Sequence, residues 1–467
     1  MMAAPGDSAG QRLVVVTATA PTPNGPLHVG HLAGPFIAAD VAARAARARG
    51  ARTLTVSGLD PHQNYVRAKA AAQGREAAGV LDEYEGLVRD ALRAARIGYD
   101  MFIDPRGDHD YRVRVARTLG EFESGAAVVT ERTTLTRCGR CATTLHHAYV
   151  SGDCPRCGLV SSGGTCEACG AFTTAENLSH VQCARCGGAP ESFPAVIPVL
   201  RLESFRAALT QTWSGALMPA RVRSLIGYYL ARGLPDVPLA YPTDWGIPVG
   251  DGGQRVDVWA EMGLGLLAGI ARRISPQADG LDEYVAAWRN VGERWHFLGI
   301  DNAFYFGIVF PCLFTAAGLD PSGLGGLVVN EFYLLDGLKF STSRGHAVWA
   351  HEFLAKEDPA LARMYLCWDR PDRFESVFTL DGYAEFRDWA GAALRAGGTL
   401  PPWLTAAEAR RASHALEFGA FDPGLAVRCL LAAGADAAPS VLGALTGDET
   451  VTEDTPAGGT SAEPRVP

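Results

Sequence analysis

The sequence predicts an α/β protein: a Rossmann-like, doubly wound parallel sheet that is split by a cysteine-rich insertion and followed by a short α-helical C-terminal domain. Two observations carry this prediction. The apolar run Val14-Val15-Val16, a tight Pro-Asn-Gly turn and the alanine-rich stretch from Leu32 to Ala48 form the pattern of a buried parallel strand, a turn and a helix. Four Cys-x-x-Cys pairs then lie within about fifty residues, after that first unit and before a second group of apolar runs.

Length and composition fit a multidomain enzyme. The 467 residues, 48% of them hydrophobic, give ample core for about three domains. The apolar runs are too short or too interrupted for a membrane span, and the start lacks a secretory signal. We therefore expect a cytoplasmic protein with no membrane partner. The formal net charge is −9, and the clearest basic cluster, Arg44 to Arg52, is either a nucleic-acid contact or a solvated helix face.

The segment from Pro23 to His31, Pro-Asn-Gly-Pro-Leu-His-Val-Gly-His, predicts a nucleotide-triphosphate site. A helix N-terminus offers unpaired N–H groups and a positive dipole to phosphates. His28 and His31 are three residues apart, so they share one face and can add two donors, and Gly30 lets a nucleotide approach the backbone. Two histidines near a turn are often satisfied surface or core residues. The rest of the chain favours the phosphate site.

A second segment, Leu338-Lys339-Phe340-Ser341-Thr342-Ser343-Arg344-Gly345, places a lysine on a loop rich in serine and glycine. Such a lysine can swing onto a leaving pyrophosphate and stabilise the charge that develops in the transition state. The segment alone is weak evidence of function.

The four Cys-x-x-Cys pairs each resemble a zinc knuckle, in which two thiolates from one tight turn chelate the metal. Eight sulfurs make two tetrahedral structural Zn²⁺ sites. A disulfide framework is the alternative, and the absence of a secretory signal argues against it. The remaining cysteines, Cys312, Cys367 and Cys429, lie in apolar runs and are expected in the core. The eight predicted ligands are Cys138, Cys141, Cys154, Cys157, Cys166, Cys169, Cys183 and Cys186.

Together these motifs resemble those of the class I aminoacyl-tRNA synthetases. The histidine segment resembles their HIGH signature, and the segment around Lys339 resembles their KMSKS loop. With zinc knuckles between the halves of the nucleotide fold, the chain is most similar to methionyl-tRNA synthetases, from about residue 12 to about residue 390. This resemblance implies nested metal sites, in which Cys154, Cys157, Cys166 and Cys169 hold one zinc and the outer four cysteines hold the other.

The resemblance also implies a division of the chain. We expect the first half of the catalytic domain at 12–125, the zinc-bearing insertion at 126–245 and the second half at 246–330. The lysine loop and a stem-contact region follow at 331–378, then a truncated helical domain at 379–445. The Gly/Thr/Glu/Pro-rich end, 446–467, is expected to be disordered.

In such an enzyme, ATP and an amino acid form an aminoacyl adenylate. The resemblance makes His28, His31 and Lys339 catalytic, and the Mg²⁺ arrives with ATP. Asp60 matches the residue that holds the amino group, and Gly299 with Asp301 matches a ribose-contacting Gly-x-Asp; a helix cap is the alternative for both aspartates. The expected ATP-binding residues are Asn24, Gly25, Gly30, Gly299, Asp301, Ser341, Ser343 and Arg344.

The amino-acid pocket departs from a methionine site. Of the matching positions only Trp259 is what such a site would show: the family's tyrosine is Thr22, and its pocket histidine is Phe306. These changes move a hydroxyl and remove a polar donor, so we expect a substrate other than methionine. Drift around an unchanged specificity is the alternative. The expected amino-acid-binding residues are Ala20, Thr22, Asp60, Trp259, Met262, Gly263, Leu266, Asn302, Phe306 and Phe310.

Two further departures concern the acceptor. The second lysine of the lysine loop is Thr342, and the helical portion is short, with no tryptophan placed for anticodon reading. We therefore expect an amino-acid-activating paralogue that passes its acyl group to a small molecule in specialised metabolism. The chain is similar to synthetase-like modules linked to cupins, which esterify an N-hydroxylated amine on the way to a hydrazine, so a separate cupin-type partner is implied.

Two other classes of protein remain open. One is an authentic methionine-tRNA ligase with a reduced anticodon-binding domain, which would also bind tRNA. The other is a non-catalytic paralogue that only binds ATP and an amino acid. The presence of His28, His31, Lys339, Asp60 and Asp301 argues against the second, because stability does not need these polar groups.

Overall fold

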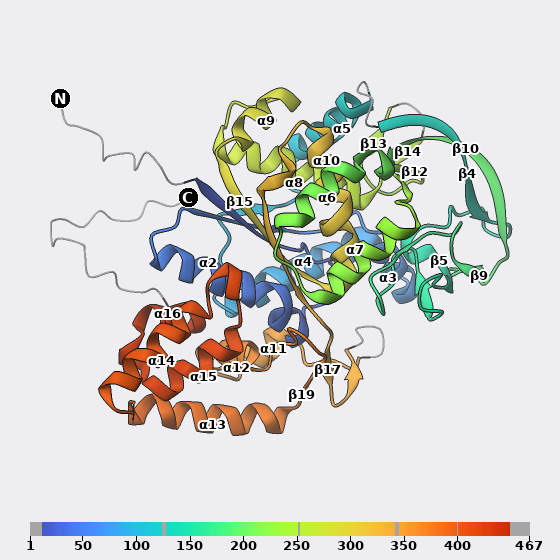
Figure 1. Ribbon diagram of the computed structural model, residues 1–467. Coiled ribbons are helices and arrows are strands. Elements are labelled where there is room, and N and C mark those ends of the chain that lie inside the picture. The colour runs from blue at the N-terminus through green and yellow to red at the C-terminus, as the bar shows by residue number, and fades with distance from the viewer. Residues whose placement is uncertain (1–11, 124–127, 251–252, 341–344, 399, 449–467) are drawn as a thin grey trace, which may run out of the picture.

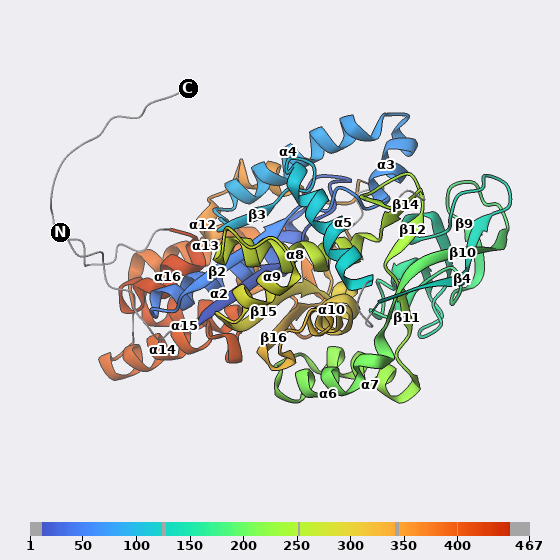
Figure 2. The same cartoon turned by 90° about the horizontal axis from the view of Figure 1, so that it is seen from above.

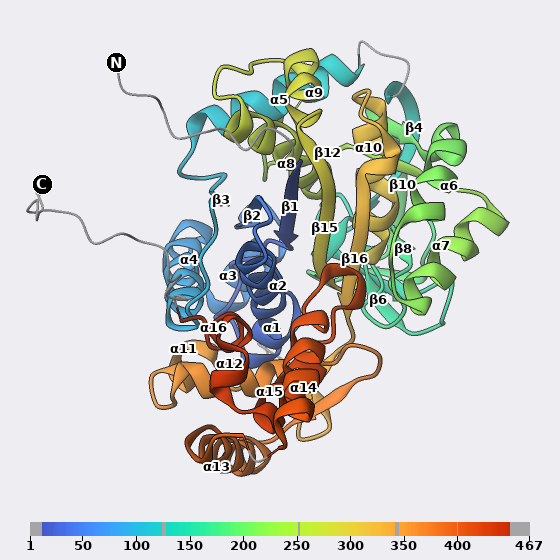
Figure 3. The same cartoon turned by 60° about the vertical axis from the view of Figure 1, so that its left-hand side comes forward.

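The central sheet is parallel and doubly wound. The computed structural model describes residues 12–123, 128–250, 253–340, 345–398 and 400–448. Within these residues, five parallel strands are ordered β16-β15-β1-β2-β3 (Figures 1 and 3). They are β1 (Leu13–Ala18), β2 (Thr53–Gly58), β3 (Met101–Ile103), β15 (Val291–Gly299) and β16 (Leu324–Asn330). The order reverses between β1 and β15, which is where such sheets bind ligands. The predicted fold class is confirmed.

Helices cover both faces of the sheet. Along β1, Val15 packs into the core under one set of helices and Val16 into the core under the other. Strands buried on both faces read as continuous aliphatic runs, which explains Val14-Val15-Val16. The helices on the Val16 side include α2 (Ile37–Ala48) and α4 (Ala77–Ala94). Those on the Val15 side are α5 (His109–Glu123), α8 (Val258–Ile274), α9 (Leu281–Trp288) and α10 (Phe310–Ala316).

The helix predicted from Leu32 to Ala48 is regular only in its second part. A single turn, α1 (Val29–His31), leads into a π-helical segment, η1 (Leu32–Phe36), and then into α2. Pro35 has no N–H to donate, and Gly34 has a non-helical ψ of −108°. Its carbonyl accepts a hydrogen bond of 3.2 Å from Arg370 Nε, so tertiary contacts replace the helical bonding. Local composition predicts the helix but not this interruption.

The insertion projects from one end of the molecule, opposite the C-terminal helices (Figure 2). Its stem is a ribbon of β4 (Val128–Cys138) and β10 (Pro190–Arg201), which pair antiparallel from Val128 and Leu200 to Cys138 and Pro190. The cysteine-rich strands are β5 (Val150–Asp153), β6 (Val160–Ser162), β7 (Gly164–Thr165), β8 (Phe172–Thr173) and β9 (Ser179–Cys183). The chain returns through α6 (Arg206–Gly215), α7 (Ala220–Arg232), β11 (Asp236–Pro238), β12 (Ala240–Pro242), β13 (Pro248–Val249) and β14 (Gln254–Val256).

The C-terminal region is helical and docks on α2. Its elements are α11 (Ala350–Leu354), α12 (Pro359–Trp368), β19 (Ser376–Phe378), α13 (Leu380–Ala396), α14 (Pro402–His414), α15 (Pro423–Ala433) and α16 (Pro439–Thr446). Arg363 of α12 is fully buried, donates to Asp40 of α2 at 2.7 Å and also bonds the carbonyls of Ala95, Ala444 and Leu445. A buried guanidinium with all of these partners joins the two regions. Residues 449–467 of the predicted disordered tail lie outside the described residues.

In the part of the chain that the structure describes, no helix combines the length and the apolar character needed to cross a membrane.

Candidate active site

A cleft lies at the carboxyl ends of β1 and β15, where the strand order reverses. It has a cavity volume of about 430 Å³ and is bounded by the sheet, the insertion and the hairpin of β17 (Tyr333–Leu335) and β18 (Leu338–Lys339). The residues from the sequence prediction that line it are Ala20, Thr22, Asn24, Gly25, His28, Gly30, His31, Asp60, Trp259, Gly299, Asp301, Asn302 and Lys339. The histidine pair, the lysine and both aspartates therefore share one cavity.

The two histidines form a stacked, uncharged pair. Their ring centroids are 3.7 Å apart, and the His28 backbone N–H donates to His31 Nδ1 at 3.1 Å, which leaves the His31 proton on Nε2. Burial lowers the pKa of His31 to about 4. Burial, and then the neighbouring His31, hold the pKa of His28 well below its usual value. At neutral pH the pair offers hydrogen bonds to an anion rather than positive charge.

A tight hairpin fixes the position of Lys339. Asp336 and Gly337 form a two-residue turn with φ of +49° and +83°, and positive φ at both positions is the type I′ geometry that Asp-Gly favours. The register then places Lys339 opposite Leu334 on β17. The Lys339 ammonium lies 3.8 Å from the centre of the Phe332 ring, at the edge of the cleft. Among the described residues no carboxylate is paired with this ammonium, which lies near the mouth of the cleft.

The lysine segment and the histidine turn are joined on both sides of the loop. Before the loop, Phe340 stacks on His28 with centroids 4.4 Å apart. After it, the Val29 N–H donates to the Val348 carbonyl at 3.0 Å, and the segment continues alongside Leu27. One helix amide that the sequence offered to phosphate is thus already paired. Ser341, Ser343 and Arg344 lie outside the described residues.

At the end of β15, Gly299 and Asp301 form a compact corner. A Cβ on Gly299 would lie 2.5 Å from Asp301 Oδ1, so any side chain there would displace the carboxylate. Burial, and then the nearby Glu167, raise the pKa of Asp301 to about 6, while Lys339 acts in the opposite direction. Asn302 Nδ2 donates to the same carboxylate at 3.2 Å. The corner therefore presents an acceptor to the cleft.

Asp60 lies at the end of β2 and is 7% exposed. Its backbone N–H donates to the Pro21 carbonyl at 3.0 Å, and its carboxylate accepts from the Thr22 hydroxyl at 3.1 Å. Burial, and then repulsion by Glu261, raise the pKa of Asp60 to about 7. A cation bound beside this carboxylate would relieve both effects.

A buried ion pair stands behind Asp60. His62 Nδ1 donates to both Glu261 oxygens, at 2.8 and 2.9 Å, and Glu261 is 3% exposed. Although burial acts against the charged imidazole, the neighbouring Glu261 raises the pKa of His62 overall. His62 therefore balances the second carboxylate next to Asp60.

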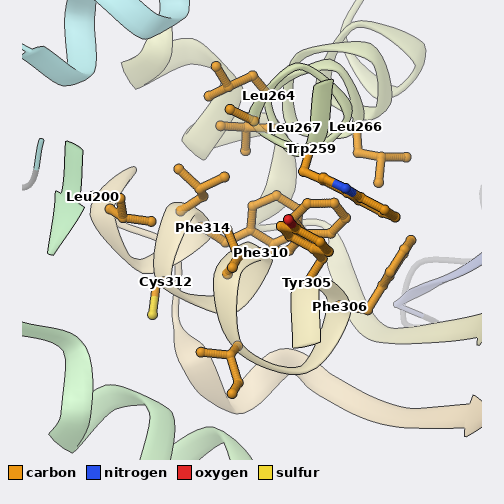
Figure 4. Close-up of a cluster of buried hydrophobic side chains, with 14 of the residues drawn as sticks. Leu200, Trp259, Leu264, Leu266, Leu267, Tyr305, Phe306, Phe310, Cys312 and Phe314 are labelled. Atoms are coloured by element: carbon orange, nitrogen blue, oxygen red, sulfur yellow. The ribbon is translucent and has the colours of Figure 1, made fainter. Parts of the chain in front are cut away.

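A smaller cavity of about 30 Å³ adjoins the cleft, and Ala20 and Asp60 belong to both. Met262, Leu266 and Phe306 line it, together with Tyr111 and Ile103. Figure 4 shows Trp259 lying flat on Tyr305, with centroids 4.0 Å apart, and Phe306 nearby. Gly263 and Phe310 line neither cavity. A Cβ on Gly263 would lie 3.0 Å from the Phe310 ring, so this pair packs one layer behind Phe306.

The eight Cys-x-x-Cys cysteines form two groups of four, and these are the nested sets that the resemblance implied. Within each group all sulfurs lie within 4.8 Å of one another. Sulfur–sulfur distances of 3.5, 3.8, 3.7 and 3.6 Å match the separation of about 3.8 Å that tetrahedral coordination at 2.3 Å requires. All are free thiols, so the disulfide alternative is wrong, and Cys312, Cys367 and Cys429 are buried. The donor set fits zinc in both groups.

The inner group contacts the floor of the cleft. Glu167, between two of its cysteines, lines the cleft, and the Arg221 guanidinium donates to the Ala168 carbonyl. Gly170 has φ +71°, and a Cβ there would lie 2.8 Å from the Ile300 carbonyl beside Asp301. The inner knuckle thus forms part of the wall, whereas the outer group packs in a small separate core.

A family model described as tRNA synthetases class I (M) matches residues 14–387. The chain belongs to this family. The methionine–tRNA ligase of Thermomicrobium roseum is 31% identical over 381 residues, covering 78% of this chain and 63% of the relative. That of Pyrococcus furiosus is 27% identical over 390 residues, covering 80% and 53%. The chain thus spans between about half and two thirds of the length of these curated relatives.

Solved synthetase structures share the fold. A Mycobacterium tuberculosis methionyl-tRNA synthetase, described as bound by methionyl-adenylate, superposes with a TM-score of 0.68 at 17% identity, over 91% of this chain and 82% of that one. This likeness supports the architecture of a class I (M) synthetase, with its insertion and helical C-terminal region.

Sequence reasoning missed two histidine–carboxylate pairs of the site. His62 lies two residues after Asp60, and Glu261 lies two residues after Trp259. Both belong to segments that the sequence analysis had already selected, so these segments could have indicated the pair. His147 and Asp257 are 2.6 Å apart beside the cleft but 110 residues apart in the chain. The adjacent histidines 146 and 147 were the only local signal for the second pair.

Proposed function

We propose that this class I (M) synthetase activates an amino acid with ATP and passes the aminoacyl group to a small-molecule acceptor other than tRNA. The observation that carries the first step is the convergence of the histidine pair, Lys339, Asp301 and Asp60 on one cleft. Phosphate donors and ribose and ammonium acceptors are what adenylate formation needs in one place.

In the activation step, Asp60 would hold the substrate ammonium and the Asp301 corner would accept the ribose hydroxyls. The substrate carboxylate, already ionised, would attack the α-phosphorus, forming the mixed anhydride while the bond to the β-phosphate breaks. His28, His31 and Lys339 would stabilise the departing pyrophosphate, with Mg²⁺ arriving on ATP. The relatives named methionine–tRNA ligase support this reaction class.

The cavity beside Asp60 would take the amino-acid side chain. Its lining combines apolar side chains, Phe306 and Leu266 among them, with the polar side chains of Thr17, Ser57, Asp60, Tyr111 and Glu261. We propose a substrate other than methionine because Thr22 and Phe306 replace the phenol and imidazole expected of a methionine site.

The hydrogen bonds of the basic cluster from Arg44 to Arg52 are consistent with an acceptor other than tRNA. Arg44 donates to Asp40 at 2.8 Å, Arg47 pairs with Asp100, and Arg49 reaches the Leu416 carbonyl. These guanidiniums serve the fold rather than a phosphate backbone, and the chain carries a net charge of −9. An N-hydroxylated amine is the proposed acceptor class, with a separate cupin-type protein to process the ester.

The relatives' names favour a second candidate, methionine-tRNA ligation. Both are tested by measuring amino-acid-dependent ATP–pyrophosphate exchange over the common amino acids, then AMP release with total tRNA or with N-methylhydroxylamine. The proposal expects exchange with an amino acid other than methionine and AMP release stimulated by the hydroxylamine. Methionine-dependent exchange with AMP release stimulated by tRNA would establish the second candidate instead.

A further inference from the structure

A buried imidazole–carboxylate pair on the cleft wall has no part in the activation step. His147 Nε2 and Asp257 Oδ2 are 2.6 Å apart, and their side chains are 7% and 4% exposed. His147 comes from the insertion, just before β5, and Asp257 precedes α8. His147 lines the same cleft as Asp60, Trp259 and Asp301.

Asp257 is itself rigidly held. It is the N-cap of α8, where its Oδ1 accepts from the backbone N–H groups of Trp259 at 3.0 Å and Ala260 at 3.4 Å. Its other oxygen accepts from His147 Nε2, which assigns a ring proton to Nε2; in a neutral imidazole Nδ1 then carries the lone pair. This is how a carboxylate orients a histidine that acts as a base.

The free nitrogen of His147 is buried and has no hydrogen-bond partner among the described residues. A buried polar atom without a partner is costly and points to a ligand or a function. The residue also has φ +46°, in the left-handed region that only a few per cent of non-glycine residues adopt. Its placement is therefore imposed by the surrounding structure rather than chosen by local preference.

Two glycines pack closely against His147. A Cβ on Gly164 would lie 2.9 Å from His147 Nδ1 and 3.7 Å from Trp259 Nε1, so only a residue without a side chain fits beside this nitrogen. A Cβ on Gly163 would lie 2.6 Å from the His147 backbone nitrogen. Both glycines, His147 and Trp259 line the cleft.

We propose that His147, oriented by Asp257, is the general base of the acyl-transfer step. This inference rests on the proposed function. The acceptor O–H gives its proton to His147 Nδ1 while its oxygen bonds to the carbonyl carbon of the aminoacyl adenylate. The carbonyl–phosphate C–O bond then breaks, AMP leaves with the electron pair, and the imidazolium returns its proton to water. Asp257 is a positioning residue that stabilises the transient imidazolium.

The two steps of the reaction differ in their need for a base. The amino-acid carboxylate is ionised and attacks ATP unaided, whereas a hydroxyl must lose its proton as it attacks. General bases contribute about 100- to 10,000-fold. Loss of His147 should therefore slow transfer far more than activation.

The test uses the zinc-loaded full chain with the amino acid found by exchange, and N-methylhydroxylamine as the acceptor probe. We expect His147→Ala to lower single-turnover transfer at least about 100-fold relative to pyrophosphate exchange. Added imidazole should restore part of the transfer in His147→Ala. Asp257→Asn keeps an oxygen for the helix cap but not the carboxylate, so it should lower the transfer-to-exchange ratio without rescue by imidazole.

His146→Asn is the matched control. His146 is equally buried, stacks on Tyr241 and bonds the Thr144 carbonyl, and it lies outside the cleft. Its transfer-to-exchange ratio should equal that of the wild type, and circular dichroism and zinc content should show all variants folded. If His147→Ala keeps the wild-type ratio, or imidazole rescues nothing, the base assignment is wrong while the proposed function stands. Wild-type protein that exchanges without transferring to the probe would overturn the acceptor class and the base together, and absence of exchange would overturn activation itself.

Discussion

The two ends of the cleft differ in the charge and burial of their polar groups. At the nucleotide end, His28 and His31 are uncharged donors and Lys339 is held on a hairpin beside an aromatic ring. At the amino-acid end, the Glu261 carboxylate is a neighbour of Asp60 and is paired with His62. The first end has the two histidines and the first lysine of the family motifs but Thr342 in place of the second lysine, and the second end departs from the family at Thr22 and Phe306. Under our proposal, the activation chemistry is retained while the substrate and the acceptor differ.

The largest expected effect is at the nucleotide end. Lys339→Ala should lower pyrophosphate exchange about 100- to 1000-fold, or about 3–4 kcal/mol, because its charge acts on the leaving group in the transition state. ATP affinity, measured by calorimetry, should change much less. Lys356→Ala, at an exposed lysine in the turn after α11, is the control. Equal losses of affinity and rate would contradict this role.

The next effect is at the amino-acid end. Asp60→Asn should raise the KM for the amino acid about 10- to 100-fold and leave that for ATP nearly unchanged, because a charge-assisted hydrogen bond to the ammonium is lost. Asp282→Asn on the exposed face of α9 serves as the control. An equal rise in the KM for ATP would contradict the assignment of Asp60 to amino-acid binding alone.

The same carboxylate predicts a pH dependence. Because burial raises the pKa of Asp60 to about 7, the carboxylate becomes protonated as pH falls through that value. Amino-acid KM should then rise toward lower pH in the wild type and stay flat in Asp60→Asn. Identical profiles for the two proteins would show that another group titrates.

The two cysteine groups differ in location: the inner group forms part of the cleft wall, and the outer group packs in a separate small core. Cys157 and Cys141 are the exposed cysteines of the inner and outer groups. Cys157→Ser should lower exchange about tenfold or more, since misplaced binding groups are costly. Cys141→Ser should lose its metal with little effect on exchange. Metal analysis and exchange on both variants test this, and similar activities at equal metal loss would refute it.

The smallest expected effect concerns side-chain selection. The double change Thr22→Tyr and Phe306→His restores the residues of a methionine site, and it should improve methionine-dependent exchange relative to the natural substrate by about tenfold. Exchange rates with the two amino acids give the ratio. A ratio that does not move would mean that other residues select the substrate.

Local sequence predicted what depends on neighbours in the chain. The strand, turn and histidine segment are contiguous, and the two cysteines of each Cys-x-x-Cys pair are near neighbours in the chain. The hairpin turn at Asp336-Gly337 was not predicted, although Asp-Gly favours such a turn. Long-range packing was not predictable. The π-helical turn at Gly34 depends on Arg370, and the His147–Asp257 pair joins the insertion to α8. Gly263 and Phe310 lie one layer deeper than their alignment suggested. The domain limits stay predictions.

The measurement that tests the central claim most directly is mass spectrometry of the enzyme-bound product after stoichiometric incubation with ATP, Mg²⁺ and pooled amino acids. We predict one aminoacyl adenylate, formed with an equal amount of pyrophosphate and absent when Lys339→Ala replaces the wild type. Release of ADP and phosphate, or ATP bound unchanged with every amino acid present, would contradict the account.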